Sequence, residues 1–134
     1  MKLTRGKRSD LLIVAITIMV VMAYGLHQRS TDARNLDLAK KRTAWTSAKT
    51  LLSLCKAYQQ DTGDYPKTLL ELVKPPSAHL PYTSEQGLLD PWARQFQYAY
   101  PGPHNSLDEP DLWSFGSNIN DPNGIIGTWT IEPR

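Results

Sequence analysis

The stretch LLIVAITIMVVMAYGL, residues 11–26, contains no charged side chain and no proline. A helix over this range is about 24 Å long at about 1.5 Å per residue, slightly shorter than the hydrocarbon core of a bilayer. Thr17 is the only clearly polar interruption, and its hydroxyl can bond to the backbone of its own helix. The stretch therefore predicts a transmembrane anchor, around which the rest of the chain is organised.

The charges on either side of this stretch predict its orientation. Lys2, Arg5, Lys7 and Arg8 precede it with only Asp10 as a counter-charge, whereas the charges in residues 27–39 cancel. The basic flank of a membrane helix stays in the cytoplasm. We therefore expect a cytoplasmic basic tail at residues 1–10, a single-pass anchor at residues 11–26 and an exported domain at residues 27–134.

A cleaved secretory signal is the competing interpretation of the same residues. The basic start and the apolar middle fit it, and Ala23-Tyr24-Gly25 is a weak match to a small-x-small cleavage site. Two features favour an uncleaved anchor. The apolar run is longer than that of typical signals, and a helical pattern continues directly after it.

Composition limits the classes of function that remain. The chain has 134 residues, enough for one small domain after the anchor, and a net charge of +2 that is too small to argue for nucleic acid. The single Cys55 cannot form an intrachain disulfide. The three histidines and Cys55 share no metal-binding spacing, and no nucleophile elbow, phosphate loop or carboxylate pair is present. These residues do not indicate an enzyme.

An amphipathic helix is predicted from about residue 32 to about residue 60. Its apolar side chains recur at spacings of three and four: Trp45, Ala48, Leu52, Cys55 and Tyr58. Only Gly25 interrupts the chain between the anchor and this helix, so the two can form one helix. Gly63 and Pro66 supply a common way to end it.

Short elements are predicted after the long helix. Residues 68–73 offer a second, short helix. Residues 95–100 alternate polar and aromatic side chains, which predicts a half-buried strand with Phe96, Tyr98 and Tyr100 on one face. Residues 112–115 and 126–131 are further strand candidates, and the loop at residues 116–124 between them is rich in turn formers.

Residues 111–121 form the one segment where the residues alone point to a metal. Hard cations such as calcium bind side-chain and carbonyl oxygens. Side-chain oxygens are supplied by Asp111, Ser114, Asn118, Asn120 and Asp121. The spacing is not that of an EF-hand, and turns without metal use the same residue types. Both interpretations stay open.

Two motifs follow the amphipathic pattern. Residues 57–76, AYQQDTGDYPKTLLELVKPP, contain a tyrosine, a polar spacer, Gly-x-Tyr-Pro and a leucine-rich turn ending in Lys-Pro. Residues 88–118, LLDPWARQFQYAYPGPHNSLDEPDLWSFGSN, contain an Asp-Pro-Trp turn, alternating aromatics, Pro-Gly-x-His and Asp-x-x-Ser-x-Gly. In this order behind a membrane helix, they resemble the major pseudopilin of type II secretion systems (GspG-like), over nearly the whole chain.

The resemblance implies an α+β, type IV pilin-like fold, in which a long N-terminal helix packs on a small antiparallel β-sheet. It implies a structural subunit of a pseudopilus in a bacterial inner membrane, with the C-terminal domain in the periplasm. The implied partners are further copies, other pseudopilins and the inner-membrane secretion platform. It also implies calcium at the Phe115 carbonyl, the Asn118 side chain and Asp121, with Asp111 and Ser114 holding the loop.

Three departures from the family pattern alter these expectations. Prepilin peptidase cuts family members between Gly and Phe, whereas Gly6 is followed here by Lys7, and Leu11 stands where a glutamate is usual. We therefore expect cleavage at Gly6 to be inefficient or absent. Ala93 replaces the glycine after Asp-Pro-Trp. Asn118 replaces an aspartate in the loop, and fewer charged ligands imply weak calcium binding.

Two alternatives to a pseudopilus subunit remain on the sequence. The first is a non-polymerising single-pass membrane protein whose exported pilin-like domain binds a partner. The missing glutamate keeps this alternative open. The second is an exported enzyme with a signal peptide, for which the sequence offers no catalytic constellation.

Overall fold

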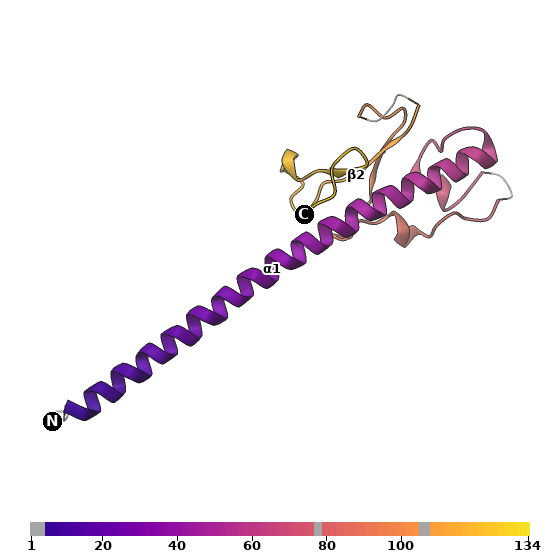
Figure 1. Ribbon diagram of the computed structural model, residues 1–134. Coiled ribbons are helices and arrows are strands. Elements are labelled where there is room, and N and C mark those ends of the chain that lie inside the picture. The colour runs from indigo at the N-terminus through magenta and orange to yellow at the C-terminus, as the bar shows by residue number, and fades with distance from the viewer. Residues whose placement is uncertain (1–4, 77–78, 105–107) are drawn as a thin grey trace. The chain divides into compact units, whose positions relative to one another are not determined.

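The computed structural model describes residues 5–76, 79–104 and 108–134, and of residues 5–9 and 11 it describes only the backbone. Within these ranges, a single long helix, α1 (Arg5–Thr62), is followed by short 3₁₀ turns and three strands (Figure 1). By internal contacts the chain divides into two compact units, Met1–Leu36 and Asp37–Arg134. The expected continuity of the anchor and the amphipathic helix is confirmed.

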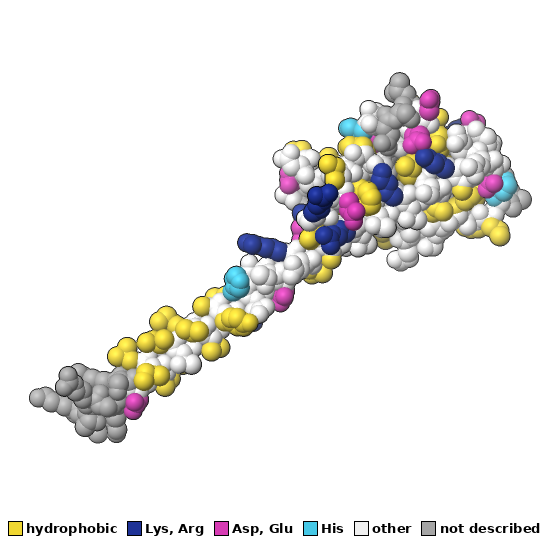
Figure 2. Space-filling model, viewed as in Figure 1, with side chains coloured by type: hydrophobic (Ala, Val, Ile, Leu, Met, Phe, Trp, Pro, Cys, Tyr) yellow, Lys and Arg dark blue, Asp and Glu magenta, His cyan; other side chains and the backbone are white. Residues whose placement is uncertain are grey.

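The first unit is the apolar half of α1. Its large side chains from Leu12 to Leu26 are exposed along the helix, as the yellow side chains in Figure 2 show on one face. The helix has the length and composition needed to cross a membrane, a test that a secretory signal also passes, and its apolar window is 0% buried in the chain's own fold. The Thr17 hydroxyl donates to the Ile13 carbonyl at 2.8 Å, as expected.

The helix ends where the sequence predicts. Gly63 has φ +93° and donates its N–H to the Gln59 carbonyl at 2.8 Å, so it closes the last turn in a left-handed conformation that suits glycine. Tyr65 and Pro66 follow and are buried. The chain therefore turns back onto the helix directly after its end.

The core of the second unit lies between one face of α1 and the segments that return over it. The helix contributes Ala48, Leu51, Leu52, Cys55 and Tyr58; the returning chain contributes Tyr65, Leu69, Leu72, Leu88, Phe96 and Leu112. Each fully buried leucine of this kind contributes about 1.5–3 kcal/mol through removal from water. Burial also raises the pKa of the Cys55 thiol to about 12, so this cysteine is a packing residue.

Three short strands form one antiparallel sheet beside the second half of α1 (Figure 1). The central strand β2 (Asp111–Ser114) pairs with β1 (Gln97–Ala99) through Gln97 opposite Trp113, and with β3 (Ile126–Gly127) through Ser114 opposite Ile126. The 3₁₀ turns η1 (Leu69–Leu72), η2 (Glu85–Leu88) and η3 (Pro122–Gly124) lie in the connections. The predicted α+β arrangement, a long N-terminal helix packed on a small antiparallel sheet, is confirmed.

The third strand is shorter than the expected 126–131. The Thr130 hydroxyl accepts the Gly127 N–H at 3.2 Å and donates to the Gly127 carbonyl at 2.8 Å, which turns the chain out of the sheet. Side chains of α1 then bind the carbonyls that follow. Arg42 donates to Pro133, Trp45 to Thr130 and Lys49 to Thr128. The C-terminal segment is thus held by the helix.

Two further expectations need correction. The segment expected as a helix at residues 68–73 is the 3₁₀ turn η1. The three aromatics expected on one strand face are not equally covered, because Phe96 is buried, Tyr98 is half-buried and Tyr100 is 47% exposed. Tyr98 instead reaches the Pro66 carbonyl with its hydroxyl, at 2.6 Å.

Candidate functional site

A buried carboxylate organises the tight turn before β1. Asp90 is 5% exposed, and its Oδ1 accepts the backbone N–H groups of Trp92 and Arg94, each at 2.9 Å. Between them Ala93 has φ +60°, which costs a non-glycine residue about 1 kcal/mol. The turn therefore keeps the shape that a glycine would favour, although alanine occupies the position.

The same carboxylate reaches the start of the loop that joins β2 to β3. The Ser114 hydroxyl donates to Asp90 Oδ2 at 2.6 Å and accepts the Gly116 N–H at 3.1 Å. Gly116 has φ +70°, and a Cβ there would lie 2.4 Å from the Gly124 carbonyl oxygen. Because the two ends of the loop approach this closely, residue 116 must be glycine. The expected role of Ser114 in holding the loop has a structural basis.

The oxygens expected to bind calcium lie in this loop. Phe115 O and Asp121 Oδ2 are 3.5 and 3.4 Å from the point that a Cβ on Gly124 would occupy, so both lie close to Gly124. Asn118 Oδ1 accepts the Asn120 N–H at 3.0 Å and shapes its own turn. Two of the three expected ligands therefore lie beside Gly124, and the third lies in the same loop.

The loop offers little negative charge. Asp121 is its one carboxylate, and Oδ1 of that group already accepts the Asn123 N–H at 3.0 Å. Across residues 5–76, 79–104 and 108–134, no three His, Cys, Asp or Glu side chains gather into a group that could hold a metal. The residues present fit a weak calcium site that depends on carbonyl and amide oxygens.

Asp111 contacts the turn that follows β1. Its carboxylate is 0% exposed, and Oδ2 lies 2.8 Å from the His104 backbone nitrogen and 3.0 Å from His104 Nδ1. A Cβ on Gly102 would lie 2.7 Å from its Cγ. These contacts position the chain that leaves β1.

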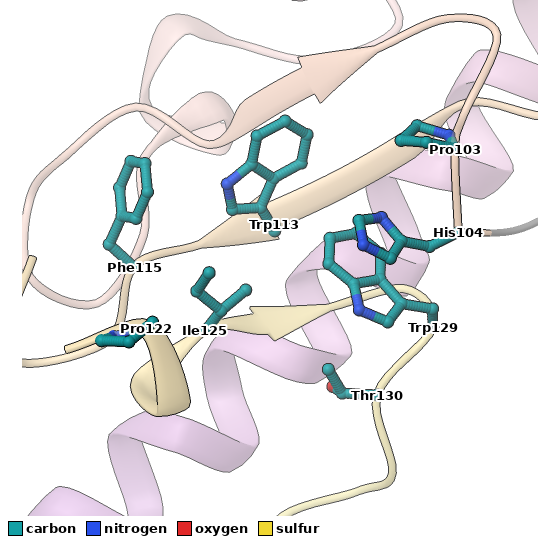
Figure 3. A pocket seen from close by; sticks show the side chains of 8 residues that line it. All are labelled: Pro103, His104, Trp113, Phe115, Pro122, Ile125, Trp129 and Thr130. Carbon is teal, nitrogen blue, oxygen red and sulfur yellow. The ribbon is translucent and has the colours of Figure 1, made fainter.

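A groove of about 530 Å³ opens beside this turn (Figure 3). The His104 ring stacks on the Trp129 indole with centroids 4.0 Å apart and 8° between the planes, and Trp113 meets Trp129 edge-on at 5.9 Å. The lining is mostly aromatic and apolar: Pro103, His104, Trp113, Phe115, Pro122, Ile125, Trp129 and Thr130.

The expected processing site lies at the start of α1. Gly6 and Lys7 fall within the helix, and the Lys7 side chain is outside the described part of the chain. The sequence alone predicts no role for Asp90 and Arg94, although both lie in the motif at residues 88–118. Their function becomes visible only when the turn and the loop are seen in contact.

Comparisons with known proteins agree with this architecture. A family model described as "Type II secretion system (T2SS), protein G" matches residues 33–126. The crystal structure of the major pseudopilin from the type 2 secretion system of enterohaemorrhagic Escherichia coli is similar, with 28% sequence identity and a TM-score of 0.54. The similarity covers 74% of this chain and 94% of that chain. No curated protein matches the sequence.

Proposed function

Because the chain belongs to the type II secretion system protein G family, it is a major pseudopilin, and we propose that it assembles with further copies of itself and with other pseudopilins through the apolar half of α1. The family is structural and not enzymatic, which sets aside the alternative of an exported enzyme. Assembly with the secretion machinery follows from the family. The contacts that achieve it are the subject of the proposal.

The observation that supports this proposal is the apolar surface of the first unit. From Leu12 to Leu26 the large apolar side chains are more than half exposed. Lipid tails can cover them in a bilayer, where no hydrophobic force drives the helices together. When such a helix leaves the membrane, its apolar surface can stay out of water only against other apolar helices. Further copies supply that surface.

Co-purification tests the proposal. Two differently tagged copies of the full chain, expressed together and extracted in a mild detergent, should purify together on either tag. Copies expressed separately and mixed after extraction are the control for detergent-induced association. Complete separation of the co-expressed tags would favour the non-polymerising alternative, in which the exported domain binds a different partner.

The proposed topology is a cytoplasmic N-terminus, a single span in the bacterial inner membrane and a periplasmic domain that reaches the secretion platform from outside. The excess of basic residues before residue 11 supports it. A periplasm-dependent reporter fused after Arg134 should be active, and a cytoplasm-dependent reporter at the same position inactive. The opposite result would contradict the orientation.

We propose that prepilin peptidase cleaves this chain after Gly6 inefficiently or not at all, because Lys7 follows Gly6 and Leu11 occupies the usual glutamate position. Mass spectrometry of the membrane form should find residues 1–6 still attached. A mature chain that begins at Lys7 would show that the peptidase accepts this site.

Weak calcium binding by Phe115 O, Asn118 and Asp121 is the proposed cofactor chemistry. The position of Phe115 O and Asp121 Oδ2 close to Gly124 supports it. With one carboxylate we expect a dissociation constant of roughly 10⁻⁴–10⁻³ M, typical of weak extracellular sites. Millimolar calcium should raise the thermal unfolding midpoint of the full chain in detergent. Asp121→Ala should remove most of that rise; no rise in the unchanged chain would contradict the site.

A further inference from the structure

One arginine joins the Asp90 turn to the loop between β2 and β3. The Arg94 Nη2 group donates to the Gly116 carbonyl oxygen, across an interval in which the chain forms both β1 and β2. Nη2 also lies 3.6 Å from Asp90 Oδ2, an ion-pair distance without hydrogen-bond geometry. The guanidinium Nη2 is therefore hydrogen-bonded to the loop carbonyl and forms an ion pair with the carboxylate.

The surroundings of Arg94 hold its side chain in this position. The guanidinium carbon lies 5.9 Å from the centre of the Trp92 ring, and only 32% of the side chain is exposed. Nε is buried and has no hydrogen-bond partner among the described residues. An unpaired buried N–H is costly. The contacts at the end of the side chain must offset that cost, so the arrangement is more specific than a solvated surface arginine.

The Gly116 carbonyl belongs to the turn on which the loop depends. Gly116 contacts the Gly124 backbone, and Gly124 lies beside both Phe115 O and Asp121 Oδ2. A cation bound at Gly116 O thus acts on the same short segment as a cation bound at Phe115 O and Asp121. The guanidinium carries its charge at every accessible pH and needs no metal from solution.

We propose that the positively charged Arg94 side chain holds the 115–125 loop against the Asp90 turn. The loop is then ordered without bound metal, and calcium adds only a second, weaker interaction. This inference rests on the proposed function only for the place where calcium would bind. Asp90 balances the charge of Arg94, and Ser114 connects Asp90 to the same loop. A loop poor in carboxylates can then keep the shape of a metal-binding loop.

Hydrogen exchange of the full chain in detergent tests the proposal. The loop contains amides with defined acceptors, among them Gly116, Asn120, Asp121, Asn123 and Gly124. In the presence of a chelator, these amides should be protected in the unchanged chain. Arg94→Met keeps the apolar stem and removes every donor. It should accelerate loop exchange on the order of tenfold, because hydrogen bonds from charged donors are among the stronger ones.

Controls separate a loop effect from loss of the fold. Amides of α1 around Cys55 should exchange as slowly in Arg94→Met as in the unchanged chain. Arg34→Met removes the same charge from an exposed position outside the second unit and should leave the loop unchanged. If Arg94→Met fails to fold, Arg94→Lys decides. It retains one charged donor group without the planar fork, so it should accelerate exchange less and only in the loop.

The calcium arm distinguishes this inference from the proposed metal site. Millimolar calcium should restore part of the loop's protection from exchange in Arg94→Met. If the loop of this variant exchanges fast in chelator and calcium restores no protection, the result would support the role of Arg94 and contradict the calcium site. Equal loop exchange in chelator for Arg94→Met and the unchanged chain would overturn the inference. Fast loop exchange in the unchanged chain that only calcium slows would also overturn the inference. If Arg94→Met does not fold, loop exchange in Arg94→Lys equal to that of the unchanged chain would overturn it.

Discussion

Replacement of Asp90 by alanine should strongly destabilise the second unit. The substitution removes the acceptor of the Trp92 and Arg94 amides, at 2.9 Å each, and of the Ser114 hydroxyl, at 2.6 Å. Hydrogen bonds to a charged group contribute about 1.5–3 kcal/mol each. Water can partly satisfy the two amides, because Trp92 and Arg94 are only half-buried. We therefore expect a loss of about 3–5 kcal/mol, the usual cost of breaking a buried charged network from one side.

Denaturant unfolding of the full chain in detergent measures this loss. All four tryptophans lie in residues 45–129, so their fluorescence reports the second unit alone. Asp90→Asn retains an acceptor for the two amides and should cost only about 1–2 kcal/mol. Asp108→Asn, at an exposed position, should stay within about 0.5 kcal/mol of the unchanged chain.

Two results would refute this reasoning. A loss below about 1 kcal/mol for Asp90→Ala would mean that the network contributes no more than one ordinary hydrogen bond. Equal losses for Asp90→Asn and Asp90→Ala would show that the charge matters and that acceptance from the two amides does not.

Burial raises the pKa of Cys55 from 9.0 to about 12. Iodoacetamide at pH 8 should therefore label the folded chain far more slowly than the unfolded chain. The stability that the neutral thiol contributes should be lost as the pH rises from 9 to 12. Equal labelling rates in both states would contradict the burial. Gly127→Ala would place a Cβ 2.7 Å from the Trp129 ring, so it should cost about 1–3 kcal/mol and shift tryptophan emission. Gly25→Ala, where nothing lies within 4 Å, is the matched control and should not reduce stability.

The sequence predicts the long helix and its end because the signals there are local. The apolar run at residues 11–26 and the three-four spacing from Trp45 to Tyr58 each belong to one helix face. Gly63 closes the helix through its own backbone conformation. Such features need no knowledge of distant contacts, and the predicted position of the helix end is confirmed within two residues.

The sequence predicts less of the third strand and of the loop, because distant residues decide both. Residues 126–131 are expected from the sequence to form one strand, yet side chains of α1 bind the carbonyls of Thr128, Thr130 and Pro133. The motif at residues 88–118 assigns no role to Arg94, and only the folded chain brings it to Gly116. Resemblance locates the loop oxygens; the contacts of Asp90 and Arg94 explain how the chain holds them.

Crosslinking in native membranes tests most directly the claim that this pseudopilin assembles with copies of itself. Lys67 and Lys74 are exposed, so an amine-reactive bifunctional reagent can join neighbouring chains without any substitution. Membranes dissolved in a denaturing detergent before the reagent is added provide the control. The account predicts a ladder of bands at multiples of 15.1 kDa that this control lacks. A single band that contains one copy of this chain and one different protein would contradict it.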